Sequence, residues 1–345
     1  MTLARHVAAA LGIALIILLV TIRLSAYRDY QIAEVAAYLT AVAGLTVLIG
    51  LSGQISIGHG AFMAIGGYAA ALLLIHLSWP LEAVFAASVV IAAVAGAIFG
   101  VAAARLRGPY LAGATLMLAV ALPAVANQYP RAFGGDQGLS VAISPPAVLG
   151  ASFPPTRWQA WVTCAAALIT LVLLANLARS RVGRSWRAVR DDEVAASLAG
   201  LNVARLQILA FVVSAACAGL GGALLAVVTG IVAPGAYTLT LSIALLTAAV
   251  LGGLGTLPGA LWGSLVLVLV PTYLTNVASS HGLSGAASSS IPIAAYGVVL
   301  IAVMLLFPSG IQGGLRRLFG SATAGPHIAL RRRTPASEHQ EEGPR

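Results

Sequence analysis

Long apolar runs separated by short polar or glycine-rich connections dominate the pattern along this chain. Runs of about 20 apolar residues are typical of α-helices that cross a lipid bilayer. The pattern predicts about ten spans, near residues 6–22, 32–50, 61–77, 81–104, 111–128, 158–178, 206–230, 238–251, 258–273 and 291–307. The fold class expected is therefore all-α, a polytopic transmembrane helical bundle.

The first apolar run allows two interpretations. It follows Arg5, and a basic start before an apolar core is also typical of a signal peptide. The run is long, and no clean cleavage site with small residues follows it. We therefore expect a retained first span, followed by a short polar turn over residues 24–31.

One long central stretch, residues 179–205, is too polar to lie within a membrane. It carries six arginines, Arg184 among them, and the acidic run Asp191, Asp192 and Glu193. We expect a short helix here, with Asp191 or Asp192 as its N-cap, Ala195 and Ala196 in its body, and Gly200 at the C′ position. A short helix held between two spans suits contact with a soluble partner. The alternative is a basic loop that only sets the membrane topology.

Arginine clusters set the expected topology, because basic residues accumulate on the cytoplasmic side of membrane proteins. Residues 105–107, 179–205 and 316–333 are then cytoplasmic, and so are both termini, whereas the connection 129–157 is external. We assign residues 1–315 to a transmembrane domain and residues 316–345 to a basic cytoplasmic tail that we expect to be disordered.

Two glycine-rich breaks interrupt the apolar pattern, and both fall on the cytoplasmic side. The first carries Gln54, Ser56 and His59, and the second Gly252, Gly253 and Gly255. Broken helices often border transport pathways, since such backbone is tolerated at membrane depth only where protein or a watery cavity covers it. An ordinary tight turn is the alternative. Two stripes of small residues are expected to support close helix packing: Gly96 with Gly100, and Gly259 with Gly263.

Composition narrows the possible chemistry. The 345 residues are 59% hydrophobic and 8% charged, with a mean hydropathy of +0.96. The net charge of +9 fits membrane topology better than nucleic-acid binding, because the arginines lie beside apolar spans. The chain has no lysine, which excludes a Walker lysine and a Schiff base within it. The six histidines have no metal-ligand spacing, and Cys164 and Cys217 are expected to be packing residues.

No acid or arginine lies in the middle of a span. The chain therefore resembles a transport pathway that lacks an energy source of its own. We expect no catalytic residue, metal or cofactor in it. Two alternatives stay open. One is a secondary carrier or facilitator that works alone for a small polar solute. The other, an enzyme acting on lipid-linked substrates, is disfavoured because acid clusters are missing.

Five sequence segments resemble the permeases of branched-chain amino-acid ABC importers of the LivM type. They are GLSGQISIGHGAFMAIGGYAAALL, RLRGPYLAGATLMLA with GGDQGLS, GRSWRAVRDDEVAASLAGLNVARLQILAFVVSAACAGLGGAL, AAVLGGLGTLPGALWGS and YGVVLIAVMLLFPSGIQG, in the family's order over residues 32–315.

The resemblance implies a bacterial inner-membrane subunit that works by alternating access. It implies a second related permease, two cytoplasmic ATPases that drive transport and an external substrate-binding protein as partners. Glu193, Ala195, Ala196 and Gly200 would lie in the loop that contacts the ATPase, and Arg184, Asp191 and Asp192 share that loop. The motif here reads E-V-A-A-x-x-x-G, one residue longer than E-A-A-x-x-x-G. Branched-chain amino acids are the implied substrates, and urea or short amides are the alternative within the same group.

Overall fold

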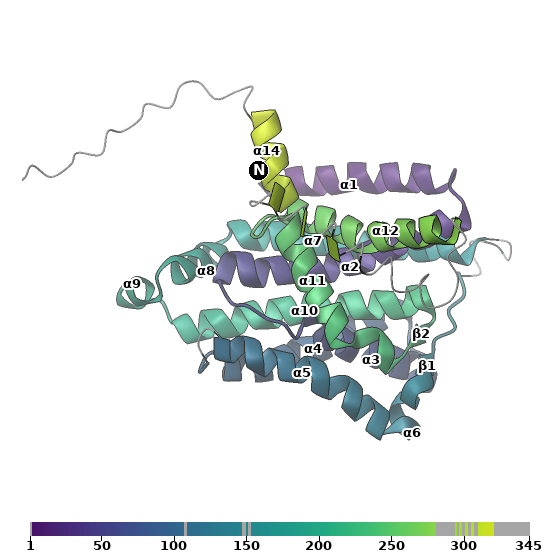
Figure 1. Ribbon diagram of the computed structural model, residues 1–345, viewed down its shortest axis with the longest axis horizontal. Helices are drawn as coiled ribbons and strands as arrows, with labels where there is room; N and C mark the ends of the chain where they lie inside the picture. The colour runs from purple at the N-terminus through teal and green to yellow at the C-terminus, as the bar shows by residue number, and fades with distance from the viewer. Residues whose placement is uncertain are drawn as a thin grey trace, which may run out of the picture.

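The computed structural model describes residues 2–106, 109–146, 150, 153–280, 294, 297–298, 301–302, 305–306 and 310–320. The expected tenth span, most of the loop after residue 280 and residues 321–345 of the tail lie outside these residues. Helices fill most of the described chain, and α8 and α9 form one end of the bundle while β1 and β2 lie at the opposite end (Figure 1).

The described elements follow one another in chain order. They are α1 (Thr2–Thr21), α2 (Ala26–Ser52), α3 (His59–Leu77), α4 (Leu81–Ala103), α5 (Pro109–Gln128), α6 (Pro130–Phe133), the 3₁₀ turn η1 (Gly135–Gln137), β1 (Leu139–Ser140), α7 (Pro155–Arg179), α8 (Arg181–Asp191), α9 (Glu193–Leu198), α10 (Val203–Thr229), β2 (Ile231–Val232), η3 (Pro234–Tyr237), α11 (Leu239–Gly252), α12 (Leu257–Ser280) and α14 (Gly310–Gly320).

Seven helices in the described part of the chain are long and apolar enough to cross a membrane, namely α2, α3, α4, α5, α7, α10 and α12. Residues Ala10–Thr21 of α1 and Leu239–Gly252 of α11 form shorter apolar helices. These nine segments match the first nine predicted spans. The outward faces of α4 and α5 remain apolar, with Val94, Ile98 and Met117 more than half exposed. Such faces suit lipid, so the chain is a polytopic, mainly helical membrane protein.

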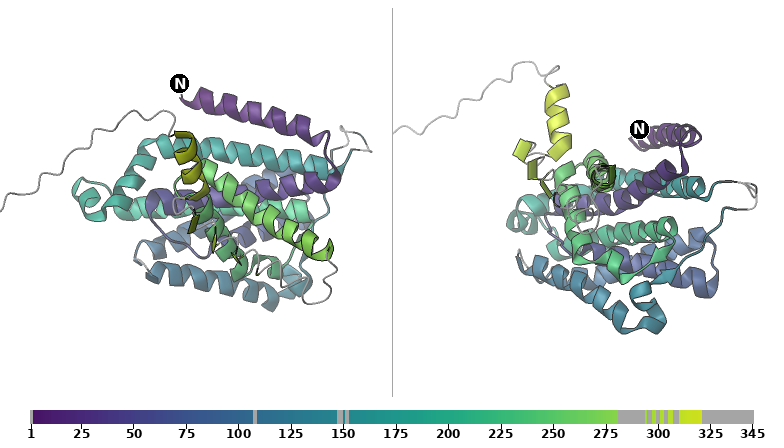
Figure 2. Two further views of the ribbon diagram at one scale, coloured as in Figure 1. Left: turned by 45° about the horizontal axis from the view of Figure 1, so that its top comes forward. Right: turned by 45° about the vertical axis from the view of Figure 1, so that its right-hand side comes forward.

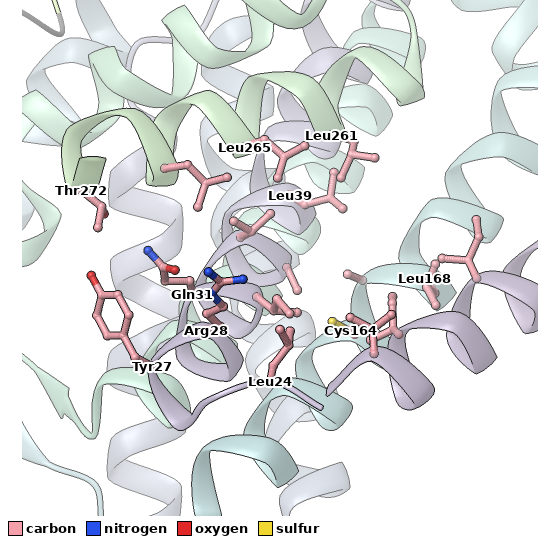
Figure 3. Close-up of a pocket in the computed structure, with 18 of the residues that line it drawn as sticks. Leu24, Tyr27, Arg28, Gln31, Leu39, Cys164, Leu168, Leu261, Leu265 and Thr272 are labelled. Atoms are coloured by element: carbon pink, nitrogen blue, oxygen red, sulfur yellow. The ribbon is translucent and has the colours of Figure 1, made fainter. Parts of the chain in front are cut away.

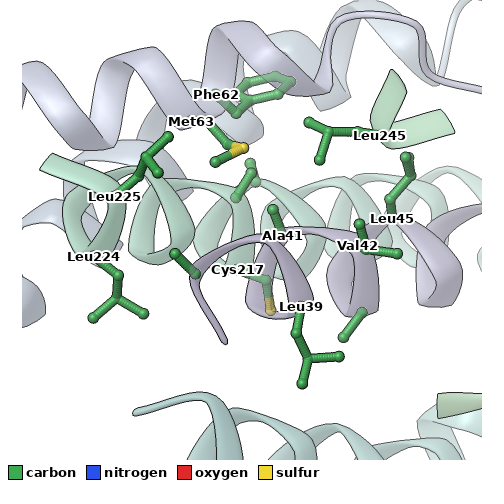
Figure 4. Packing of buried hydrophobic residues seen from close by; sticks show 14 of the residues in the cluster. Leu39, Ala41, Val42, Leu45, Phe62, Met63, Cys217, Leu224, Leu225 and Leu245 are labelled. Carbon is green, nitrogen blue, oxygen red and sulfur yellow. The ribbon is translucent and has the colours of Figure 1, made fainter. Parts of the chain in front are cut away.

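α2 and α10 form the centre of the bundle, and small residues let their backbones approach closely. A Cβ on Gly221 would lie 2.8 Å from the carbonyl oxygen of Ala37, and one on Gly44 would lie 2.5 Å from Cβ of Cys217. Both cysteines are free and buried. Side chains from α2, α3, α10 and α11 meet where α2 packs against α10 (Figure 4).

The outer helices pack on this centre through further small residues. On α4, Gly96 and Gly100 face α10, where a Cβ at Gly96 would lie 2.4 Å from Cβ of Ala215. α1 lies on the outside of the bundle beside α7 (Figure 2). α11 and α12 pack against each other, and both contact α2.

Three details differ from the predicted elements. α2 starts at Ala26, so most of the expected polar turn at 24–31 is helix. The expected loop at 129–157 contains α6, η1 and β1, and β1 pairs antiparallel with β2 (Leu139 with Val232), a pairing that two-residue strands do not reveal in sequence. α14 reaches Gly320, past the predicted start of the tail at 316.

An ion pair explains why the helical start of α2 replaces the expected turn. Asp29 lies in the first turn of α2, where a carboxylate complements the helix dipole. It is buried, and Oδ2 lies 3.5 Å from Nε of Arg157 at the start of α7. The pair therefore joins two spans at the end of the bundle away from α9.

Replacing Gly222 by alanine is expected to destabilise the bundle. A Cβ there would lie 1.8 Å from the carbonyl oxygen of Met63, so α3 and α10 must separate, and overpacking costs about 1–3 kcal/mol. The thermal midpoint of the detergent-solubilised protein, measured by tryptophan fluorescence, should fall by several degrees. Gly113→Ala is the matched control, because nothing lies within 4 Å of its added Cβ. Equal midpoints for both variants would refute this packing.

Candidate functional site

The first glycine-rich break, residues 53–58, connects α2 and α3 inside the bundle. Gly53 ends α2 with φ 75°, a left-handed conformation that favours glycine, and its N–H donates to the carbonyl of Ile49. Three polar side chains follow and are turned inward: Gln54 is 6% exposed, Ser56 0% and His59 1%. An ordinary tight turn at the surface would leave them in water.

Three other spans hold this break in place. The amide of Gln54 donates to the carbonyl of Gln207 on α10 at 3.2 Å. The N–H of Ile57 donates to Oγ1 of Thr115 on α5 at 3.0 Å, and the N–H of Gly60 donates to Oγ of Ser242 on α11 at 3.1 Å. The break is therefore the meeting point of α2, α3, α5, α10 and α11.

Several polar atoms at this meeting point lack a hydrogen-bond partner among the described residues. They are Oε1 of Gln54, Oγ of Ser56 and Nδ1 of His59, and each is buried. Nε2 of His59 donates to the carbonyl of Ala41 at 3.2 Å, which leaves Nδ1 as an acceptor. Since buried polar groups nearly always find partners, these atoms can form hydrogen bonds with water or with a small polar molecule that reaches them.

The second break lies between α11 and α12 at residues 253–256. Gly253 and Gly255 have φ of 114° and 79°, conformations that favour glycine. The two helices then pack backbone to backbone: a Cβ on Gly252 would lie 1.9 Å from the carbonyl oxygen of Gly259, and one on Gly263 would lie 2.0 Å from that of Ala248.

The two breaks touch each other directly, although 200 residues separate them in sequence. A Cβ on Gly50, in the last turn of α2, would lie 2.2 Å from the backbone nitrogen of Gly255 and 2.3 Å from its Cα. Only glycine at position 50 permits this approach. The end of α2 and the α11–α12 turn therefore form one junction.

Arg190, the penultimate residue of α8, reaches this junction. Its NH1 donates to the carbonyl of Gly50 at 2.6 Å, and its Cγ lies 2.8 Å from where a Cβ on Gly53 would be. Nε and NH2 of the same guanidinium donate to Oδ1 of Asp191 at 3.0 and 2.7 Å, which orients the group. From the sequence, Arg190 is expected only to be one of the arginines that set the membrane topology.

The central arginine-rich stretch folds as two helices, where the sequence predicted one. Ser180 caps α8, and Asp192 caps α9 by accepting from the N–H groups of Val194 and Ala195 at 2.9 and 3.0 Å. Of the two N-cap candidates, Asp192 is therefore the cap, and Asp191 ends α8. Gly200 has φ 83° and follows α9 as expected.

Buried aromatic and polar contacts fix these two helices to the bundle. Trp186 is fully buried on α8, and its Nε1 donates to the carbonyl of Leu206 at 2.8 Å. Glu193, at the start of α9, accepts from Nε2 of Gln207 at 2.9 Å. Because the carbonyl of Gln207 also accepts from Gln54, this residue connects α9 with the first break.

The outer face of α9 is apolar and uncovered. Val194 is 69% exposed and Leu198 84% exposed, one helical turn apart, whereas Ala196 on the opposite face is buried. Arg184 and Ala195 are exposed as well, and Arg184 donates to the nearby carbonyl of Arg179. α9 protrudes from the end of the bundle (Figure 1), so this face is accessible to another protein.

Comparison with known proteins gives consistent matches over most of the chain. Residues 27–308 match the family model described as branched-chain amino acid transport system / permease component. The chain is 32% identical over 249 residues to the high-affinity branched-chain amino acid transport system permease protein LivM of Escherichia coli, an alignment that covers 66% of this chain and 58% of that protein.

Two other relatives align over more of their own length. LivH of Salmonella typhimurium is 32% identical over 293 residues, and BraD of Pseudomonas aeruginosa is 29% identical over 296, each covering 81% of this chain and 92% of the relative. Both carry the name of high-affinity branched-chain amino acid transport system permease proteins. No solved structure matches the chain significantly.

Proposed function

This chain belongs to the family of permease components of branched-chain amino acid transport systems, and we propose that it is the membrane-spanning subunit of an ATP-binding-cassette importer. It spans 58% of the length of the LivM relative and 92% of LivH and BraD. We assign it to the bacterial inner membrane, with the α8–α9 end in the cytoplasm, as its arginines favour. The chain itself hydrolyses nothing.

The observation that supports this function most strongly is the connection between α9 and the two breaks. A soluble ATPase bound to Val194 and Leu198 would move α8 and α9 as a unit, because Asp192 both ends α8 and caps α9. Trp186 would pass the movement on to α10 through the carbonyl of Leu206. Arg190 and Gln207 would transmit that displacement to Gly50 and Gln54. In this mechanism the break residues rearrange and the spans around them open first to one side and then to the other.

The transported solute is proposed to be a branched-chain or related small amino acid. Its charged ends need polar partners, which Gln54, Ser56 and His59 offer through their unpaired buried atoms. Its apolar side chain would contact surrounding groups such as Phe62 and Leu245, which are fully buried near the same spans. The remaining partners follow from the family: a second related permease, two ATPases and an external binding protein.

Uptake into proteoliposomes tests the function directly. The complex of this chain with its companion permease, ATPases and binding protein should accumulate radiolabelled leucine only when ATP is supplied on the ATPase side. The purified chain alone should not accumulate it, with or without a proton or sodium gradient. Gradient-driven uptake by the lone chain would contradict the proposal and favour a secondary carrier. ATP-driven uptake of urea, with no leucine uptake, would overturn the substrate class alone.

Replacing Gln54 by leucine is expected to raise the KM for uptake about tenfold, since a lost hydrogen bond to a charged group is worth roughly 1.5–3 kcal/mol. The variant retains the size of the side chain and removes both its donor and its unpaired Oε1. Gln159→Leu is the matched control, because this glutamine donates to the carbonyl of Val227 away from both breaks. An unchanged KM in Gln54→Leu would show that Gln54 does not contact the transported solute.

A further inference from the structure

A groove with a volume of about 930 Å³ lies on the side of the bundle away from α4 and α5. α2 forms its floor, while α1 and α7 form one wall and α12 forms the other (Figure 3). Nothing in the proposed transport mechanism uses this groove, and neither break contributes a residue to it.

The two ends of the groove differ in chemistry. Apolar side chains line most of it, among them Leu39 on the floor, Leu168 and Leu171 on α7, and Leu265 on α12. The polar side chains gather at one end, where Tyr27, Arg28, Gln31 and Thr272 are seen in Figure 3 and Tyr273 and Asn276 continue α12.

Arg28 brings a positive charge to the polar end of the groove. Its side chain is exposed, and the neighbouring Asp29 is buried and pairs with Arg157. No acidic residue is found among the described residues that line the groove. The polar end therefore presents a guanidinium, two phenols and two amides, all of which can donate to a phosphate oxygen.

The part of α2 that lines the groove is about as long as one leaflet of a bilayer is thick. Leu39 lies eleven residues after Arg28 on α2, which is about 16 Å along a helix axis. Half of a hydrocarbon core is about 15 Å thick. An acyl chain whose phosphate contacts Arg28 would therefore end near the bottom of the apolar part, and tyrosines at the polar end would lie at headgroup depth.

We propose that this groove is a binding site for one phospholipid of the external leaflet. The phosphodiester group contacts Arg28, the amides of Gln31 and Asn276 lie at headgroup level, and an acyl chain runs between α7 and α12 over Leu39. Such a lipid fills the space between α1 and α12, so it would stabilise the position of α12 beside α2.

Photo-crosslinking in lipid nanodiscs tests this site. The full chain is incorporated with a phosphatidylglycerol that carries a diazirine on its acyl chain, and the adducts are mapped by mass spectrometry after proteolysis. Adducts should concentrate on groove-facing residues of α2, α7 and α12. Arg28→Ala should lower their yield about threefold or more, as expected for one charge-assisted contact. Arg23→Ala is the matched control, because Arg23 is exposed nearby but does not line the groove.

A second variant distinguishes lipid binding in the groove from general contact with lipid. Leu168→Trp should fill the apolar part and lower adduct formation on α2 and α12, without changing adducts on the exposed face of α4 at Val94. Adducts spread evenly over all apolar faces and insensitive to Arg28 would overturn the proposal. So would a photoreactive amino acid at Leu265 that captures a second protein chain in the assembled complex, since the groove would then be a subunit interface.

Discussion

Leu198→Asp is expected to abolish binding of the ATPase and, with it, uptake. Leu198 is 84% exposed at the tip of α9, and a partner that covers it would have to bury an unpaired carboxylate. The cost is several kcal/mol, so the amount of ATPase that co-purifies with the chain should fall about a hundredfold. Co-purification from membranes that express the whole complex, followed by quantitative immunoblotting, measures this loss.

The conservative variant Leu198→Met provides the control for this experiment. It retains an apolar side chain of similar volume on the same turn, so the complex should assemble as in the wild type. Because Leu198 is exposed in the isolated chain, neither variant should alter the thermal midpoint of the isolated chain. Normal co-purification of the ATPase with Leu198→Asp would show that α9 is not its docking site.

Arg190→Ala is expected to leave the complex assembled but unable to transport. The substitution removes the hydrogen bond from α8 to the carbonyl of Gly50 and the packing of the side chain on Gly53. The ATPases should still bind α9 and hydrolyse ATP, whereas leucine uptake should fall about tenfold or more for the loss of a charge-assisted hydrogen bond. Uptake and phosphate release measured in the same proteoliposomes give the number of solutes moved per ATP.

Two further variants make this result specific to the guanidinium. Arg181→Ala removes an exposed arginine from the first turn of the same helix and should transport normally. Arg190→Lys retains the charge but not the forked geometry that reaches Gly50 and Asp191 together, so uptake should lie between those of wild type and Arg190→Ala. If Arg190→Ala moves as many solutes per ATP as the wild type, the proposal that Arg190 transmits movement through Gly50 is wrong.

The spans were predictable from the sequence because their signal is local. About 20 apolar residues in a row fix a helix whatever surrounds it, and the nine described apolar segments match the predicted ones. The start of α2 was missed because Tyr27, Arg28 and Asp29 are polar. Their helical conformation depends on the ion pair with Arg157, which lies 128 residues later.

α8 was missed for a different reason. Its density of arginines favoured a loop, yet Val182, Trp186 and Val189 recur at intervals of four and three residues, which places them on one helix face. Trp186 and Val189 are buried in the structure. The spacing of these three apolar residues predicts α8, if it is given more weight than the number of arginines.

The junction between the two breaks could not be predicted from the sequence. Each break could be placed from its glycines, but the contact of Gly50 with Gly255 depends on how α11 crosses α2. The role proposed for Arg190 depends on the same tertiary geometry, since the carbonyl that it reaches belongs to a distant span. The candidates Gln54, Ser56 and His59 rested on polarity within a break, and the structure adds that they are buried with unpaired atoms.

The most direct test measures whether ATP binding moves the junction through Arg190. Pulsed electron paramagnetic resonance measures the distance between two spin labels. One is placed at Leu254, in the exposed turn of the second break, and the other at Val120, on the outer face of α5. Cys164 and Cys217 are buried, and the chain without added cysteines gives the background. The account predicts that ATP shifts this separation in the assembled complex and that Arg190→Ala abolishes the shift. An equal shift in the Arg190→Ala complex, or no shift while leucine uptake proceeds, would contradict it.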